Sequence, residues 1–241
     1  MRFGVPHPRL SLRVCHGASL SPIVPPLSAA GTQAVPYPLP KRLVDKFVSG
    51  LLLLLLSPIV VLVLVAMAVG MLAVPADRGG VLYREPRISR GRTFQLLKFR
   101  TLREAALHDM RRTGGHARLY EADPANLTWA GRRVLKPWYL DEIPQLFNVL
   151  RGDISLVGPR PWPPEMVERQ VADGLGYRNR VMAGLTGPAQ VTKGEGVPYA
   201  ELDEGYVQRS CSLGGWALLR YDVEILARTL RVIARGEGLN Y

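Results

Sequence analysis

The longest apolar stretch of the chain covers residues 47–76, which include no charged side chain. As one straight helix it would measure about 45 Å, against a bilayer hydrocarbon core of about 30 Å. Pro58 removes a backbone hydrogen bond and clashes with the preceding turn, whereas Ser57 can donate to a freed carbonyl. The pattern therefore favours a bent hairpin over residues 41–76 that enters one leaflet, since each arm is shorter than the roughly 20 residues that cross a bilayer. A straight transmembrane helix with a mild kink at Pro58 is the alternative.

Positive residues flank this stretch on both sides, and such residues favour the cytoplasmic side of a membrane. The pattern places both ends of the apolar segment at the cytoplasmic face. The basic residues are Lys41, Arg42 and Lys46 before the stretch and Arg78, Arg84, Arg87, Arg90 and Arg92 after it.

A second pattern lies in residues 139–161, where apolar positions recur at three- and four-residue spacing after Pro144. Proline suits the first turn of a helix, so we expect the helix to begin near Asp141 and Glu142. A carboxylate is favoured at that position by about 0.3–1 kcal/mol and stays ionised, as a nucleophile or a magnesium ligand must be. An N-cap role for Asp141 and a charge-complementing role for Glu142 explain the same positions.

Downstream of this helix, Gly152 is expected to end it, and residues 153–157 are expected to form a short strand. Pro159 and Pro161 fix the backbone on both sides of Arg160 and push it toward an extended conformation. Such a guanidinium presents a planar fork to phosphate oxygens, which suits a diphosphate. A surface ion pair between Arg160 and Asp153 is the competing interpretation.

The rest of the chain predicts one modest domain of mixed α+β, mainly helical fold over residues 77–241. Residues 1–40 are rich in proline and contain no acidic residue, which is typical of a disordered tail. Near the C-terminus, residues 216–233 carry a helical apolar stripe that packs on the core or lies at a membrane interface.

The formal net charge of +11 is compatible with nucleic acid, anionic lipid or an acidic substrate as partner. No recognition helix or zinc-ligand spacing accompanies it, and the basic residues flank the apolar stretch, so anionic lipids rather than nucleic acid are the expected partner. Cys15 and Cys211 are far apart and give neither a disulfide framework nor a metal site.

Taken together, four sequence blocks resemble the bacterial sugar transferase family of monotopic polyprenyl-phosphate phosphoglycosyl transferases. The resemblance runs from about Lys41 to the C-terminus. The blocks are K-R-L-V-D-K before an apolar segment with Ser57-Pro58, L-K-F-R-T from Leu97, L-D-E-I-P-Q-L-F-N-V-L-R-G-D-I-S-L-V-G-P-R-P from Leu140, and G-L-T-G-P-A-Q-V from Gly184. The third block is long and very specific.

The resemblance implies a reaction in which a UDP-sugar gives its sugar-1-phosphate to undecaprenyl phosphate and UMP is released, as the first step of surface glycan synthesis. It implies that Asp141 is the nucleophile and that Glu142 helps to hold Mg²⁺. It also implies substrate-binding roles for a set of basic residues and for one aspartate in the final helix. These residues are Lys98, Arg100, Lys136, Arg160 and Asp222.

The chain departs from the family pattern at three places, none of which touches the catalytic pair. Lys136 stands where many members have arginine, residues 137–139 read Pro-Trp-Tyr in place of small hydroxyl residues, and residues 192–194 read Thr-Lys-Gly in place of Asn-Gly-Arg. A catalytically silent membrane scaffold for glycan assembly is the alternative function, and a membrane-tethered nucleic-acid binder is a third. The identity of the sugar and the oligomeric state stay open, with a homodimer as one candidate.

Overall fold

The computed structural model describes residues 34–192 and 196–235, which form a mainly helical α+β domain. Its helices are α1 (Leu39–Ala73), α2 (Glu104–Thr113), α3 (Ala117–Glu121), α4 (Gln145–Arg151), α5 (Pro164–Ala172), α6 (Pro188–Val191), α7 (Tyr199–Ser212) and α8 (Gly215–Ala234). Its strands are β1 (Leu82–Ser89), β2 (Arg92–Phe99), β3 (Ser155–Val157) and β4 (Gly184–Thr186). Short turns of 3₁₀ or π type are η1 (Pro75–Asp77), η2 (Pro124–Asn126), η3 (Gly131–Leu135), η4 (Lys136–Trp138), η5 (Leu140–Glu142) and η6 (Tyr177–Asn179).

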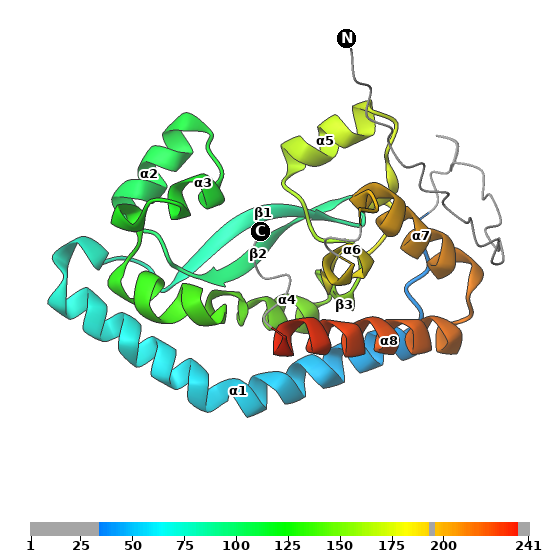
Figure 1. Cartoon of the computed structure of the whole chain (residues 1–241), viewed down its shortest axis with the longest axis horizontal. Coiled ribbons are helices and arrows are strands. Elements are labelled where there is room, and N and C mark those ends of the chain that lie inside the picture. The colour runs from blue at the N-terminus through cyan, green and yellow to red at the C-terminus, as the bar shows by residue number, and fades with distance from the viewer. Residues whose placement is uncertain (1–33, 193–195, 236–241) are drawn as a thin grey trace, which may run out of the picture. The chain divides into compact units, whose positions relative to one another are not determined.

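Helix α1 is continuous but bent, and Figure 1 shows it as two arms that meet at an angle. Pro58 lies inside the helix and has no N–H to donate. The Ser57 hydroxyl donates to the Leu54 carbonyl at 2.7 Å, which is the carbonyl that an N–H at position 58 would have bound. The expected bend and the expected role of Ser57 are therefore confirmed. In the part of the chain that the structure describes, α1 is the one helix long and apolar enough to cross a membrane.

Strands β1 and β2 form an antiparallel hairpin, with Leu82 opposite Phe99 and Ser89 opposite Arg92. The two linking residues, Arg90 and Gly91, both have positive φ, 51° and 71°. Such a two-residue turn matches the twist of the strands, and glycine adopts its left-handed backbone without strain. Strands β3 and β4 form a separate parallel pair, and β3 confirms the strand expected after Gly152.

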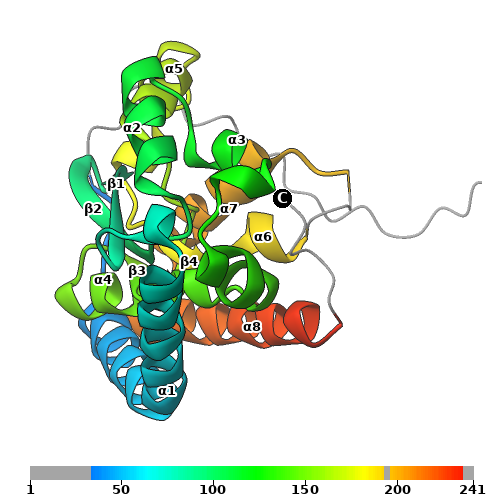
Figure 2. The ribbon, with the colours of Figure 1, turned by 90° about the vertical axis from the view of Figure 1, so that its left-hand side faces the viewer.

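Helices α4 and α8 pack against α1, and Figures 1 and 2 both place α4 between α1 and the β1–β2 hairpin. The main core gathers around the short strand β3 and includes Val149, Ile154, Val157 and Ile225. Leu218, Asp222 and Ile225 of α8 are buried. The domain core thus rests directly on the first arm of α1.

The last residues of the expected N-terminal tail are packed, which corrects its boundary. Val35 is 2% exposed, and its N–H donates to the Arg180 carbonyl at 2.8 Å. The Tyr37 hydroxyl donates to Asp45 at 2.7 Å. Proline content alone did not reveal this packing, because the hydrogen-bond partner of Val35, Arg180, lies far along the chain. Residues 1–33, where most of the expected tail falls, lie outside the described residues.

The helix expected near Asp141 and Glu142 begins later, at α4, and ends at Gly152 as expected. Asp141 and Glu142 lie in the separate turn η5, and Pro144 is the capping residue of α4 without a side-chain cap. The N-cap interpretation of Asp141 is therefore wrong. The macrodipole of α4 also does not explain an ionised carboxylate here, because Asp141 and Glu142 precede the helix and the effect of the macrodipole falls off within the first turn.

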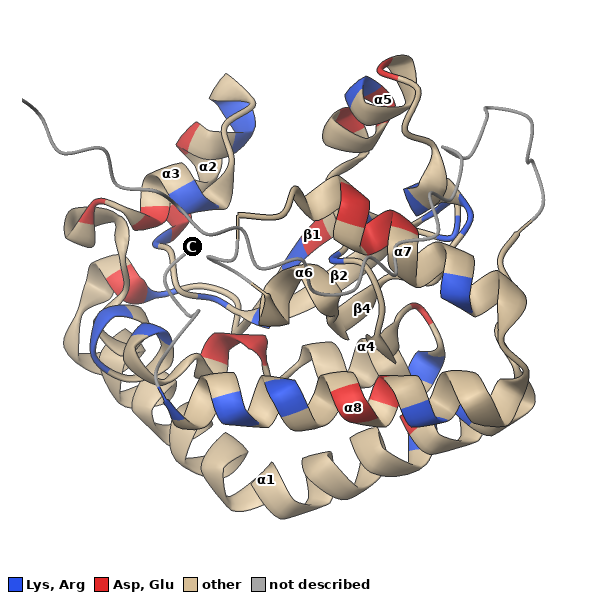
Figure 3. Ribbon diagram, turned by 45° about the vertical axis from the view of Figure 1, so that its right-hand side comes forward, with Lys and Arg blue, Asp and Glu red and all other residues tan. Residues whose placement is uncertain are grey.

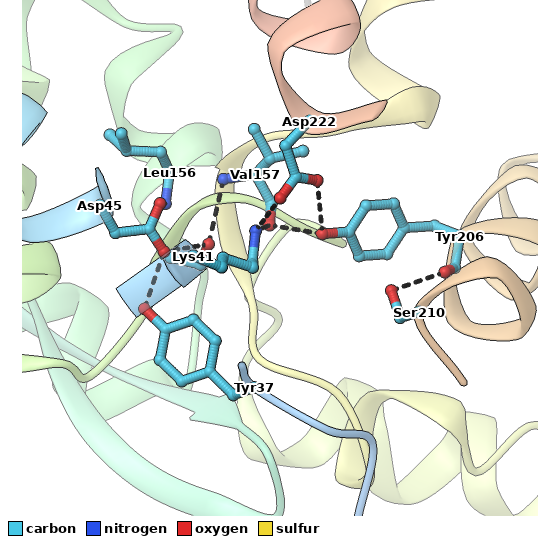
Figure 4. Close-up of polar contacts among 9 residues, drawn as sticks. Tyr37, Lys41, Asp45, Leu156, Val157, Tyr206, Ser210 and Asp222 are labelled. Carbon is cyan, nitrogen blue, oxygen red and sulfur yellow. Dashed lines mark hydrogen bonds and ion pairs between the residues drawn. The ribbon is translucent and has the colours of Figure 1, made fainter. Parts of the chain in front are cut away.

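A buried set of polar residues joins α1 to the rest of the domain, and we call it the anchor cluster: Lys41, Asp45, Ser155, Val157, Tyr206 and Asp222 (Figure 4). Lys41 Nζ contacts Asp222 Oδ2 at 2.5 Å and donates to the Val157 carbonyl at 3.0 Å. Asp45 accepts a hydrogen bond from Ser155 Oγ at 2.7 Å. These bonds connect residues 110 to 181 positions apart in the chain, so they fix the first arm of α1 to β3 and α8.

Candidate functional site

Asp141 is the buried centre of the candidate site, with 2% of its surface exposed. It follows Tyr139, a non-glycine residue held in the left-handed conformation with φ 53°. That conformation costs roughly 1–2 kcal/mol for an ordinary residue, and such strain concentrates at functional sites. The left-handed residue separates η4 from η5, so it redirects the chain just before the carboxylate.

Glu142 is the accessible member of the pair, with 37% of its side chain exposed. Its Oε1 lies 3.3 Å from Arg160 Nη2 and 3.7 Å from Lys98 Nζ. Lys98 comes from β2 and Arg160 from the segment after β3. Two segments far apart in the sequence therefore place a cation beside the same carboxylate. The fold thus brings together three residues to which the family resemblance assigned roles in one site.

Lys136 is the third cation of the site and stands between two carboxylates. Its Nζ contacts Glu121 Oε2 at 2.7 Å and Asp141 Oδ2 at 3.5 Å. Glu121 also accepts a hydrogen bond from Thr101 Oγ1 at 2.7 Å. Glu121 is absent from the sequence expectations, because it lies in a polar stretch without periodicity and only the fold brings it to Lys136.

The two adjacent carboxylates have opposite pKa shifts. Burial raises the pKa of Asp141 above its usual 3.8; Lys136 and Lys98 oppose the shift, whereas Glu142 and Glu121 add to it. Burial also acts to raise the pKa of Glu142, but Arg160, Lys98 and Lys136 outweigh it and hold that pKa below 4.5. Burial acts to lower the pKa of Lys136, and the neighbouring Asp141 and Glu121 reverse that effect and raise it. Glu142 is thus the more firmly ionised carboxylate of the pair.

Arg100 does not point into this site, which corrects its expected role in substrate binding. It is 1% exposed, and its guanidinium donates to three backbone carbonyls, those of Asp77, Gly80 and Leu102, at 2.5–2.8 Å. Each of its three nitrogens is therefore engaged in a structural hydrogen bond, and the group is buried away from a phosphate in solution. Arg100 instead ties the start of the domain after α1 to the end of β2.

Asp222 is also placed elsewhere, in the anchor cluster of Figure 4. It is 3% exposed, pairs with Lys41 and accepts a hydrogen bond from the Tyr206 hydroxyl at 3.0 Å. These contacts give Asp222 a structural, salt-bridging role in place of the substrate-binding role that the resemblance implied. The ion pair between Arg160 and Asp153 that the sequence left open is not formed either, since Asp153 pairs with Arg151 at 2.6 Å.

Charged residues outside the site do not gather on one face of the domain. Figure 3 shows basic segments on many elements, with acidic segments between them. Within residues 34–192 and 196–235, no group of three or more His, Cys, Asp or Glu side chains is close enough together to hold a metal ion by itself. A cation at this site would need ligands from a substrate as well as from the protein.

Residues 37–236 match the family model described as bacterial sugar transferase. The chain is 34% identical to an undecaprenyl-phosphate glucose phosphotransferase of Komagataeibacter xylinus, over 93% of this chain and 42% of that protein. It is 33% identical to an undecaprenyl-phosphate galactose phosphotransferase of Salmonella typhimurium, over 82% of this chain and 41% of the relative.

A third relative is closer to this chain in length. The exopolysaccharide production protein ExoY of Sinorhizobium fredii is 34% identical over 82% of this chain and 87% of its own length. The chain thus spans about two fifths of the first two relatives and most of the third. With a family match over most of its length and Asp141, Glu142, Lys98 and Arg160 assembled by the fold, this chain belongs to the bacterial sugar transferase family.

Proposed function

We propose that this protein transfers a sugar-1-phosphate from a UDP-sugar to undecaprenyl phosphate, as the initiating step of a surface glycan. The observation that carries the proposal is the buried Asp141 beside a half-exposed Glu142, with Lys98, Lys136 and Arg160 within 3.3–3.7 Å of one or the other. Carboxylates flanked by several cations suit a reaction between two phosphate-bearing substrates. The names of the relatives from K. xylinus and S. typhimurium support a polyprenyl phosphate acceptor.

In this proposal Asp141 is the nucleophile. One carboxylate oxygen forms a bond to the sugar-linked phosphorus of the UDP-sugar, and the bond from that phosphorus to the bridging oxygen breaks, so UMP leaves with the electron pair. A phosphate oxygen of undecaprenyl phosphate then attacks the same phosphorus and expels the Asp141 carboxylate. The first step needs ionised Asp141, and Lys136 at 3.5 Å favours that form. Two displacements with good leaving groups replace one difficult encounter between two anions.

The three cations have separate tasks in the proposal. Arg160 and Lys98 stabilise negative charge on the transferring phosphoryl, and the planar fork of Arg160 fits two phosphate oxygens at once. Their contacts with Glu142 are 3.3 Å and 3.7 Å long, and all three side chains are 20–37% exposed. Such loose, partly solvated pairs are worth little by themselves, so phosphate oxygens can replace the carboxylate at small cost.

Magnesium is the expected metal, and the donor set fits it. Mg²⁺ binds through one or two carboxylates and completes its shell with waters and substrate phosphates, so the absence of a three-ligand group among the described residues does not oppose it. Glu142, half-exposed and ionised, would hold it, with Asp141 adjacent in the chain. When bound, the ion would offset the repulsion between the carboxylates and the diphosphate.

The apolar helix α1 supports a membrane location next to a lipid-linked acceptor. We propose that its bend makes it a re-entrant hairpin, with both ends and the catalytic domain at the cytoplasmic face of the bacterial inner membrane. Anionic lipid headgroups would meet the exposed basic residues that flank it, such as Arg42, Lys46 and Arg78, whereas Lys41 is buried in the anchor cluster. Labelling of cysteines engineered near Lys46 and near Arg78 tests this topology. Modification from the same side supports the hairpin, and modification from opposite sides contradicts it.

The test of the reaction is UMP release by the detergent-solubilised protein from a panel of UDP-sugars, with Mg²⁺ and with or without undecaprenyl phosphate. Release from one donor, with turnover that needs the lipid acceptor, supports the proposal and identifies the sugar. Wild-type protein that releases no UMP from any donor contradicts it. In that case restoration of glycan synthesis in cells by Asp141→Asn would favour the scaffold function.

A further inference from the structure

Residues 157–162 connect β3 to α5 and carry Arg160 between Pro159 and Pro161. The prolines restrict φ on both sides of Arg160, but they do not determine in which direction its side chain leaves the backbone. That direction depends on what holds the peptide groups of the segment.

The first half of the segment is held by the anchor cluster and by β4. The Val157 carbonyl accepts hydrogen bonds from Lys41 Nζ and from the Tyr206 hydroxyl, each at 3.0 Å (Figure 4). The N–H of Gly158 donates to the Thr186 carbonyl at 2.8 Å, and the Pro159 carbonyl accepts from the N–H of Gly184 at 2.9 Å. The close approach requires glycine, because a Cβ at Gly184 would lie 2.1 Å from the backbone nitrogen of Gly158.

The second half is held at Trp162, whose carbonyl accepts a hydrogen bond from the Ile88 N–H of β1 at 2.9 Å, and at Arg160 by the side chain of Arg178. Its Nη1 donates to the Arg160 carbonyl, and its Nη2 donates to Asp203 Oδ2 at 2.7 Å. The guanidinium also lies 4.0 Å from the ring centroid of Trp162, two residues beyond Arg160. Arg178 is 5% exposed, and Asp203 is 1% exposed, so water cannot replace these contacts.

These three contacts use the particular shape of arginine. One edge of the fork reaches the peptide of Arg160, the other reaches Asp203, and the flat face stacks on Trp162. A lysine keeps the charge and can satisfy one of the partners, but it lacks the planar fork and the stacking face. If Arg178 served only to neutralise Asp203, the contact with the Arg160 carbonyl and the stacking on Trp162 would be unnecessary.

We propose that Arg178 is a positioning residue for Arg160: it holds the Arg160 peptide so that the Arg160 guanidinium projects toward Glu142 and the donor diphosphate. The inference rests on the proposed function, since a phosphate-bearing substrate is what Arg160 would meet. Arg178 touches no reacting atom, so its effect on the rate passes entirely through Arg160. Neither the spacing nor the charge pattern of the sequence distinguishes it from the other arginines.

The test is a double-mutant cycle on steady-state UMP release, with wild type, Arg178→Lys, Arg160→Ala and the double variant. A displaced catalytic group costs up to about 100-fold, so Arg178→Lys is expected to lower kcat by about 10- to 100-fold. The KM for the UDP-sugar is expected to change less, since a misdirected guanidinium still contributes charge to binding. In the Arg160→Ala background the same substitution should cost less than about 2-fold, because the residue it positions is gone.

A structural role alone predicts another result, in which the losses of the two single variants multiply in the double variant; that outcome overturns the inference. Arg209→Lys is the matched control, because Arg209 also stacks on an aromatic ring, that of Tyr221 at 4.6 Å, and should keep wild-type kcat. Should Arg178→Lys not fold, Trp162→Leu replaces it in the cycle, with a smaller loss that likewise vanishes without Arg160. Wild type that releases no UMP refutes the proposed function itself, whereas an active wild type with multiplying losses refutes this inference alone.

Discussion

Two groups of carboxylates and cations in this domain are built from the same residue types but differ in geometry. In the anchor cluster, Lys41 and Asp222 lie 2.5 Å apart with side chains 5% and 4% exposed. At the candidate site, Glu142 lies 3.3 Å and 3.7 Å from its two cations, and the three side chains are 20–37% exposed. The anchor pair is also completed by the Val157 carbonyl and the Tyr206 hydroxyl.

This difference separates a structural ion pair from one that can exchange partners. A buried pair with short contacts cannot release either partner without leaving a charge in the interior. A longer, half-exposed pair loses little when a phosphate displaces one partner. By the same comparison Arg100 is a structural cation like Lys41, because it is buried and donates to three carbonyls, although it lies only two residues from Lys98 in the chain.

The largest expected effect is on catalysis. Asp141→Asn removes the proposed nucleophile with little change in volume, so turnover should fall by at least about 10⁴-fold. Membrane association should be retained and the unfolding temperature should not fall, because Lys136 keeps its contact with Glu121. UMP release and membrane fractionation provide the measurements. Asp173→Asn, the same substitution at the exposed end of α5, is the control and should keep wild-type turnover. Full activity in Asp141→Asn would refute the role of Asp141.

The next effect is on stability and belongs to the anchor cluster. Asp222→Ala leaves the Lys41 ammonium buried without its partner, which should cost about 3–5 kcal/mol of unfolding free energy. Glu224→Ala removes an exposed pair on the same helix, with Arg220 at 3.7 Å, and should cost no more than about 0.5 kcal/mol. Denaturant unfolding in detergent measures both. Equal losses in the two variants would contradict the distinction between the two kinds of pair.

A smaller effect concerns the fork of Arg160. Arg160→Lys keeps the charge but loses the planar pair of donors, so kcat should fall by about 10- to 100-fold while stability changes by less than about 1 kcal/mol. Steady-state UMP release and thermal unfolding measure the two quantities. Lys98→Arg is the complementary variant. It replaces an ammonium with a longer, forked cation, so it should lower kcat less than Arg160→Lys does. Arg160→Lys with wild-type kcat would mean that only its charge matters.

The smallest effect is a pair of opposite shifts in stability with pH. The raised pKa of Asp141 favours its protonated form in the folded state, so its stabilising contribution is present below pH 3.8 and lost as the pH rises through the raised value. The lowered pKa of Glu142 gives a contribution that is present above pH 4.5 and lost as the pH falls through the lowered value. At neutral pH, Asp141→Asn should therefore raise the unfolding temperature and Glu142→Gln should lower it. Unfolding temperatures between pH 3 and pH 8 check both signs, and shifts of the same sign contradict the account.

The sequence predicted the parts of this fold that depend on local rules. Pro58 and Ser57 indicate a bend wherever they lie in an apolar helix, and Gly152 ends a helix because it adopts the left-handed conformation, here with φ 83°. The proposed catalytic pair was recognisable because its block of residues is long and specific. These inferences needed no knowledge of long-range contacts.

The parts that were wrong or missed depend on contacts between distant segments. Lys41 and Asp222 are 181 residues apart, and no local pattern indicates that they meet. Arg100 looked like a phosphate ligand, because a sequence shows a positive charge but not the three carbonyls that accept its hydrogen bonds. Glu121 and Arg178 lie in stretches without a motif, and their positions beside Lys136 and Arg160 follow only from the assembled domain.

The most direct test of the central claim is to trap the intermediate that Asp141 would form. Purified protein is mixed with the active UDP-sugar, radiolabelled in the sugar, with Mg²⁺ but without undecaprenyl phosphate, and then quenched and separated from free nucleotide. The account predicts a burst of UMP that approaches one equivalent per protein molecule, with label bound to wild type and none bound to Asp141→Asn. UMP release that requires the lipid acceptor from the first turnover, with no label on the protein, would contradict it.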